Sequence, residues 1–130
     1  MLKKIPFITL FISLFVNLAF ANSNDNISQT ALQTMMKSST NANVVLLDVR
    51  SPEEYAEGHV PGAINISHTK IKDNLAQLLN HKNDTIIVYC RSGHRAGIAK
   101  TILVKNGFTK IRHLSGDMNG WYDAKLPIEK

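Results

Sequence analysis

The feature that most constrains the fold is a continuous apolar run at residues 44–49, interrupted only by Asp48 near its end. A strand with one face in water alternates apolar and polar residues, whereas a strand buried on both faces is apolar nearly throughout. The run therefore predicts a strand of a parallel sheet that is covered on both faces. Parallel neighbours need crossover connections, which are usually helices, so this run alone favours an α/β fold.

The rest of the chain alternates in the way that such a sheet requires. Residues 85–88 form a second apolar, β-branched run, and residues 64–66 and 110–114 predict shorter strands. The spacing of apolar residues predicts helices over 27–37, over 71–80 and from 96 to a stop at Asn106-Gly107. Capping signals at Ser51-Pro52 predict a short helix over 51–55, and another is expected over 118–122. We expect one domain with a mostly parallel sheet and helices on both faces.

The N-terminus has the pattern of an export signal. Lys3 and Lys4 precede an apolar stretch, and Ala19-Phe20-Ala21 forms a small-x-small cleavage site. The stretch is shorter than the ~20 residues that a membrane span needs. We therefore expect a signal peptide over 1–21, a polar linker over 22–26 and the folded domain over 27–130. Cleavage after Ala21 predicts a periplasmic or secreted protein without a membrane anchor, and the alternative is an uncleaved anchor.

Charge and histidine placement argue against several classes of partner. The formal net charge is +5, but the lysines are scattered and no aromatic-interleaved basic stripe occurs, so no nucleic-acid surface is predicted. The five histidines share no recognised ligand spacing. We therefore expect neither a metal nor another cofactor.

Cys90 is the only cysteine, and it is the candidate nucleophile. Exported proteins normally pair their cysteines, and one left over suggests a reactive thiol or an intermolecular disulfide. Cys90 follows the predicted 85–88 strand and precedes a helix, where unpaired backbone N–H groups and the helix dipole favour a thiolate. Arg91 and Arg95 add positive charge nearby. The alternative is that Cys90 is a small buried apolar residue.

Asp48 and Arg50 are unusual at the end of a buried strand. Ligands of open α/β sheets bind beyond the carboxyl ends of the strands, so both side chains are candidates for the border of the Cys90 loop. The alternative is that they only tie down the loop that follows them.

Several segments together resemble a rhodanese domain, and the likeness covers the chain from about Ile27 onward. Its motifs are Leu47-Asp48-Val49-Arg50, Glu54-Tyr55, Gly58-His59-Val60-Pro61-Gly62-Ala63-Ile64-Asn65, Cys90-Arg91-Ser92-Gly93-His94-Arg95, Asn106-Gly107-Phe108, and Leu114-Ser115-Gly116 followed by Trp121. The chain is similar to small, exported, single-domain thiosulfate sulfurtransferases. The resemblance implies a monomer whose partners are a small-molecule sulfur donor and acceptor.

By the same resemblance, Cys90 takes the outer sulfur of thiosulfate, sulfite leaves, and the resulting persulfide passes its sulfur to cyanide or a thiol. Arg95 closes the loop, and Asp48 and Arg50 support it. Two positions depart from the common pattern: Asp117 stands where a second glycine is frequent, and Ala96 where a small hydroxyl residue is frequent. We expect neither to contact the nucleophile. The residues implied to bind substrate, some through backbone donors, are Arg91, Ser92, Gly93, His94 and Arg95.

Two other functions compete with sulfur transfer from thiosulfate. One is a non-catalytic sulfur carrier or interaction module, which an intact cysteine loop disfavours. The other is a related phosphatase or arsenate reductase, which also uses a cysteine in a loop closed by an arginine. In the resemblance, those relatives have one more residue in the loop than the six that run here from Cys90 to Arg95.

Overall fold

The computed structural model describes residues 25–38 and 43–130, so the predicted signal peptide and most of the predicted linker lie outside the described residues. Its core is a sheet of five strands in the order β1-β5-β4-β2-β3, and all four pairings are parallel. The prediction of an α/β fold around a mostly parallel sheet is confirmed. The strands are β1 Asn26–Ile27, β2 Val44–Asp48, β3 Ile64–Asn65, β4 Thr85–Tyr89 and β5 Ile111–Leu114.

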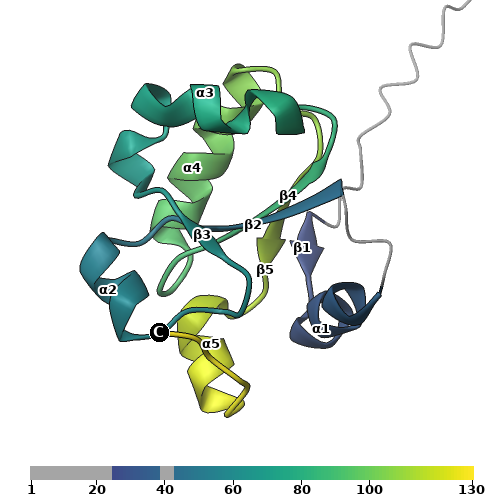
Figure 1. Cartoon of the computed structure of the whole chain (residues 1–130), viewed down its shortest axis with the longest axis vertical. Coiled ribbons are helices and arrows are strands. Elements are labelled where there is room, and N and C mark those ends of the chain that lie inside the picture. The colour runs from purple at the N-terminus through teal and green to yellow at the C-terminus, as the bar shows by residue number, and fades with distance from the viewer. Residues whose placement is uncertain (1–24, 39–42) are drawn as a thin grey trace, which may run out of the picture.

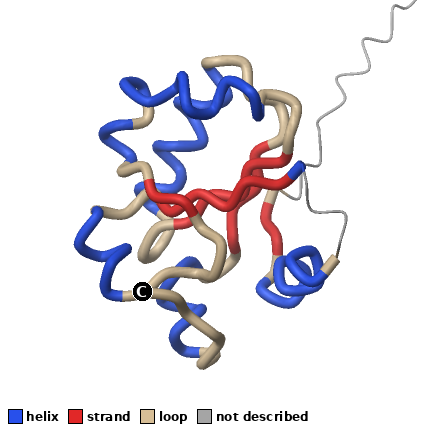
Figure 2. The backbone as a smooth tube through the Cα atoms, in the orientation of Figure 1, coloured by secondary structure: helices blue, strands red, loops and turns tan. Residues whose placement is uncertain are grey.

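Helices lie on both sides of this sheet, as predicted. Figure 1 shows α3 and α4 on one side and α1 and α5 on the other, and Figure 2 shows the strands as a single layer between them. Three single turns of 3-10 helix, His68–Lys70, Lys72–Asn74 and Leu79–His81, flank α3. The α-helices are α1 Gln29–Lys37, α2 Pro52–Glu57, α3 Leu75–Leu78, α4 His94–Lys105 and α5 Asp117–Asp123.

Strands β2 and β4 contribute apolar side chains to the core on each face of the sheet. Leu47 and Val88 are fully buried with the residues of α4, whereas Leu46 and Ile87 pack with α1 and α5. Because successive side chains of a strand point to opposite faces, an unbroken apolar run fills both layers. This is why β2 and β4 carry the clearest strand signals in the sequence.

Two predicted elements differ from the structure. Ile27 was expected to begin a helix, but it lies in β1 and pairs with Leu114 of β5. The helix predicted over 71–80 is broken, and α3 keeps only four residues of it. Asn74 leaves the helical conformation, and its side-chain amide donates to the Lys70 carbonyl at 2.8 Å. Asparagine side chains compete with helical hydrogen bonds in this way, so apolar spacing alone overstated the length of the helix.

The start of α2 matches its predicted signals. Ser51 accepts a hydrogen bond from the Glu54 N–H at 3.2 Å, and the Glu54 carboxylate turns back toward Ser51 in a capping box. Pro52 occupies the first helical position, where its missing N–H costs no helical hydrogen bond. The capping box fixes the Glu54 side chain at the end of α2 that faces the start of α4, as its pairing with Arg95 shows.

In the described part of the chain, every helix is too short or too polar to cross a bilayer.

Candidate functional site

Cys90 lies in the loop that joins β4 to α4. Gly93 adopts a φ of +115°, a left-handed conformation that glycine tolerates and other residues resist. This conformation directs the Gly93 N–H to the Cys90 Sγ, with a nitrogen-to-sulfur distance of 3.0 Å. The Cys90 residue is only 1 % exposed. The loop therefore holds the sulfur with a backbone donor aimed at it, which is a suitable setting for a sulfur anion.

The loop residues predicted to bind substrate do not share one environment. Arg91, Ser92 and His94 are exposed, whereas Arg95 is partly buried. The helix begins at His94, two residues earlier than predicted, so His94 and Arg95 belong to its first turn. Among these loop residues, Gly93 supplies a backbone N–H that points at the Cys90 sulfur in the described structure.

Residues at the start of α5 hold the other side of the loop. The Met118 N–H donates to the Cys90 carbonyl at 2.9 Å, and the Asn119 N–H donates to the Arg91 carbonyl at 3.1 Å. Asp117 completes this set, because its Oδ1 accepts a hydrogen bond from the Cys90 N–H at 3.0 Å. The expectation that Asp117 does not contact the nucleophile is therefore wrong. Asp117 has a φ of +53°, which the frequent glycine would also permit, and this conformation brings its carboxylate to the loop.

Ala96, the other departure from the family pattern, is buried in the same apolar core as Leu47 and Val88. A small side chain is what this packed position accepts.

Arg95 binds α2 through a two-pronged ion pair. Its Nη1 and Nη2 lie 2.7 Å and 2.9 Å from Oε1 and Oε2 of Glu54. The hydrogen bonds and charge of Arg95 lower the pKa of Glu54 from 4.5 to about 2, and Glu54 in turn raises the pKa of Arg95. Glu54 was predicted to lie in the helix over 51–55 and belongs to the Glu54-Tyr55 motif of the resemblance, but no partner was predicted for its side chain. No spacing rule links it to Arg95, which lies 41 positions further along the chain.

Asp48 and Arg50 form a buried network below the loop. Arg50 Nη2 lies 2.7 Å from Asp48 Oδ2 and also donates to the Gly58 carbonyl at 2.8 Å. The Tyr89 hydroxyl donates to the same Asp48 oxygen at 2.9 Å and accepts from the Val60 N–H at 3.1 Å. The network ties the ends of β2 and β4 to the loop at residues 58–60.

Burial and charge act together on this network. Burial would by itself lower the pKa of Arg50, but the hydrogen bond and charge of Asp48 outweigh it, and the pKa is raised. Burial, reinforced by Asp48, also raises the pKa of Tyr89. Tyr89 therefore remains a neutral hydrogen-bond donor to Asp48. Its role as the link between Asp48 and Val60 was not visible in the sequence, where Tyr89 follows the 85–88 run as one more apolar residue.

A polar hollow of about 360 Å³ borders the loop between α2 and α5. Arg50 reaches it from the buried network, so this side chain both supports the loop and faces the hollow. Its walls mix positive and negative side chains, which suits a small polar or charged ligand. The lining residues are Arg50, Glu54, Glu57, Arg91, Met118, Asn119 and Tyr122.

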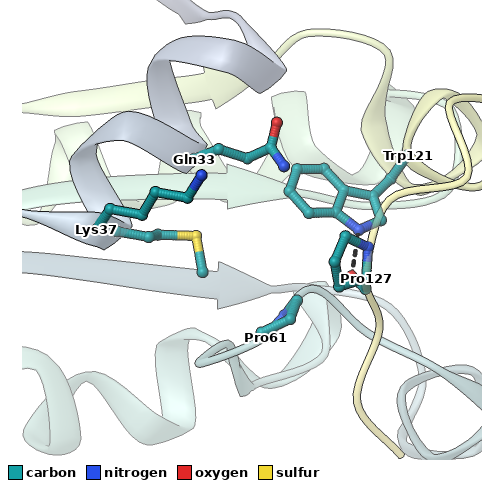
Figure 3. Close-up of a pocket in the computed structure, with 6 residues that line it drawn as sticks. Gln33, Lys37, Pro61, Trp121 and Pro127 are labelled. Carbon is teal, nitrogen blue, oxygen red and sulfur yellow. Dashed lines mark hydrogen bonds between the residues drawn. The ribbon is translucent and has the colours of Figure 1, made fainter.

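A second hollow of about 270 Å³ lies beside α1 and is mainly apolar. Figure 3 shows Gln33 and Lys37 of α1 on one side of it and Trp121 with Pro127 on the other, where the indole N–H donates to the Pro127 carbonyl at 2.8 Å. None of the residues that line it belongs to the Cys90 loop. The structure thus separates this apolar hollow from the candidate site.

The described residues contain no cluster of three or more histidine, cysteine or acidic side chains that could hold a metal ion. One histidine has a clear structural role: His59 is buried, its ring stacks on Tyr55 at 3.6 Å, and its Nδ1 lies 2.8 Å from the Tyr55 carbonyl oxygen.

Comparison with known proteins decides the family. The model of the rhodanese-like domain matches residues 28–124. The chain belongs to this family. Thiosulfate sulfurtransferase PspE of Escherichia coli is 44 % identical over 70 residues, which are 54 % of this chain and 67 % of that protein. Thiosulfate sulfurtransferase 16 of Arabidopsis thaliana chloroplasts is 40 % identical over 93 residues, covering 64 % of this chain and 78 % of the relative.

The fold agrees with solved structures of the family. A rhodanese-related protein from Thermoplasma volcanium superposes with a TM-score of 0.68 over 80 % of this chain and 96 % of its own, at 24 % identity. Together with the sequence relatives, family membership supports sulfur transfer between small sulfur compounds as the class of reaction.

Proposed function

We propose that this chain transfers the outer sulfur of thiosulfate to a thiophilic acceptor through a persulfide on Cys90. The observation that carries the proposal is the Gly93 N–H, which lies 3.0 Å from the Cys90 sulfur in a loop flanked by Arg91 and Arg95. A donor already aimed at the sulfur stabilises negative charge there without having to reorganise during the reaction.

The proposed reaction has two displacement steps. The Cys90 thiolate attacks the outer sulfur of thiosulfate, the sulfur–sulfur bond of the donor breaks, and sulfite leaves with the electron pair. Cyanide or a thiolate then attacks the outer sulfur of the persulfide, and Cys90 leaves as a thiolate. The cysteine is regenerated after each cycle, so no external oxidant or reductant is needed.

The electrostatics around the loop support an anionic donor. Arg91 is exposed and lines the polar hollow, so it is available to a dianion such as thiosulfate. Arg95, by contrast, already has a carboxylate partner in Glu54. We therefore assign donor binding to Arg91 and loop closure to Arg95.

The experiment is an assay of the purified protein with thiosulfate and cyanide, followed by the formation of thiocyanate. The wild type should form thiocyanate, and incubation with thiosulfate alone should add the mass of one sulfur atom, which cyanide then removes. Cys90→Ser should do neither, because an alcohol in this loop stays protonated and carries no transferable sulfur. Thermal unfolding of both proteins should show that the variant is folded. A fully active Cys90→Ser protein would overturn the proposal, and so would a wild type without activity.

A further inference from the structure

Asp117 has a backbone conformation that its side chain resists. Only Asp117 and Lys125 have positive φ among the non-glycine residues in the described structure. A residue with a Cβ is strained in this region, although aspartate tolerates it better than most. Glycine would avoid that strain, so the contacts of the carboxylate indicate what is gained by having aspartate at this position.

The Asp117 carboxylate lies close to Cys90 and to Gly93, the first and last residues between β4 and α4. Its Oδ1 accepts a hydrogen bond from the Cys90 N–H at 3.0 Å and lies 2.8 Å from Nε2 of His113. A methyl group added at Gly93 would come within 3.2 Å of Asp117 Oδ2 and 3.4 Å of His113 Cε1. The Asp117–His113 pair therefore forms a floor beneath the glycine whose N–H points to the sulfur.

The two partners differ in their access to solvent. Asp117 is 3 % exposed, whereas the side chain of His113 is 28 % exposed and approaches the carboxylate from β5. A buried carboxylate needs its hydrogen bonds. His113 holds one of its oxygens in place, and the same oxygen then holds the first peptide group of the loop.

We propose that Asp117 is a positioning residue for Cys90, with His113 as the group that orients its carboxylate. This inference rests on the proposed function and adds a residue to it. Asp117 fixes the Cys90 peptide at one end of the loop and packs against Gly93 at the other. The Gly93 donor and the sulfur thereby keep their relative position through the two displacements. Reactions of this kind tolerate little misplacement, because about 1 Å can cost on the order of a hundredfold in rate.

Two substitutions at Asp117 test whether its carboxylate positions Cys90 or whether aspartate is merely tolerated where glycine is frequent in the family. Asp117→Gly keeps the left-handed backbone without strain but removes the acceptor for the Cys90 N–H. Asp117→Asn also tolerates this backbone and keeps a side-chain oxygen that accepts the same hydrogen bond. Both variants should remain folded, and thermal unfolding checks this for each.

The first measurement is the steady-state transfer of sulfur from thiosulfate to cyanide. Asp117→Gly should lower kcat by about tenfold or more, because it loosens the position of Cys90. It should change KM for thiosulfate little, because donor binding is assigned to Arg91 and not to Asp117. Asp117→Asn should recover most of that loss. If Asp117→Gly is as active as the wild type, or if Asp117→Asn is as slow as Asp117→Gly, the positioning role is refuted.

The second measurement does not depend on sulfur transfer. The rate at which iodoacetamide alkylates Cys90 should change in Asp117→Gly and return toward the wild-type rate in Asp117→Asn. His113→Ala should shift that rate in the wild-type background and have no further effect in the Asp117→Gly background, because the two residues act through one hydrogen bond. Additive effects would contradict the proposed role of His113. If the wild type fails to transfer sulfur while these alkylation results hold, the proposed function has failed and the positioning of Cys90 stands.

Discussion

Glu54→Gln tests the link between the cysteine loop and the rest of the fold. Glu54 joins the first turn of α2 to Arg95 in the first turn of α4 through two hydrogen bonds of 2.7 Å and 2.9 Å. Glutamine has nearly the same shape but carries no charge, and it replaces one of the two oxygens that accept these bonds with a donor. The substitution should therefore destabilise the protein at neutral pH without creating a cavity.

The size of the effect follows from the pKa of the carboxyl group. Lowering that pKa from 4.5 to about 2 corresponds to roughly 3 kcal/mol, at 1.36 kcal/mol for each pKa unit. The Glu54 side chain is 30 % exposed, so solvent screens part of this interaction. We expect Glu54→Gln to lower the free energy of unfolding by about 1–2 kcal/mol at pH 7.

The pH dependence has a definite sign. Because the pKa is lower in the folded state than in the unfolded state, the stabilisation by ionised Glu54 is complete above about pH 4.5. It is lost as the pH falls from there toward 2, since the unfolded chain takes up the proton first. Glutamine does not titrate. The stability difference between wild type and Glu54→Gln should therefore shrink over this range.

Urea unfolding at a series of pH values between 7 and 3 measures this difference directly. Glu53→Gln is a matched control, since Glu53 is exposed and lies in the same first turn of α2. The control should stay within about 0.5 kcal/mol of the wild type at pH 7, as is usual for surface substitutions. A difference in the free energy of unfolding between wild type and Glu54→Gln that stays constant with pH would refute the reasoning. An equal loss of stability in Glu53→Gln at pH 7 would refute it as well.

Three further predictions concern the core, the chemistry and the N-terminus. Tyr89→Phe should lower the free energy of unfolding by about 1–3 kcal/mol in a urea titration, because it leaves the buried Val60 N–H without an acceptor; a neutral change would contradict this. Because its loop has six residues from Cys90 to Arg95, the protein should turn over thiosulfate and leave an aryl phosphate essentially intact; comparable rates in a parallel assay would favour a phosphatase. We also propose export with cleavage after Ala21, so the protein isolated from expressing cells should begin at Asn22 by mass spectrometry, and a membrane-bound form that retains Met1 would contradict it.

The sequence predicts those parts of the fold whose signals are local. The apolar runs place β2 and β4 within a residue of their observed bounds, and Ser51 with Pro52 places the start of α2. Strand β1 could not be found in this way, because two residues show no periodicity. It is defined by its pairing with β5, in which Ile27 lies beside Leu114.

The features of the site also differ in whether they depend on local sequence or on tertiary packing. The position of Cys90 between a strand and a helix is a local property, and the structure places it there. Its contacts with Asp117 and the pair formed by Arg95 and Glu54 join residues 27 and 41 positions apart. Such distances follow from the packing of α2 and α5 around the loop, which no spacing rule contains. The wrong expectation for Asp117 arose because a departure from a glycine pattern says nothing about where the new side chain points.

The strand order has a consequence for the sequence in which the sheet assembles. The first strand of the described structure, β1, lies at the edge of the sheet and pairs with β5, so Asn26 is beside His113 and Ile27 is beside Leu114. Strand β1 therefore cannot join the sheet until β5 is available, whereas β5 also pairs with β4, which lies much closer to it in the chain. Contacts between such distant segments pay a large loop-closure entropy and form slowly. Strand β1 should thus be the last to join, added to an assembly of β2, β4 and β5.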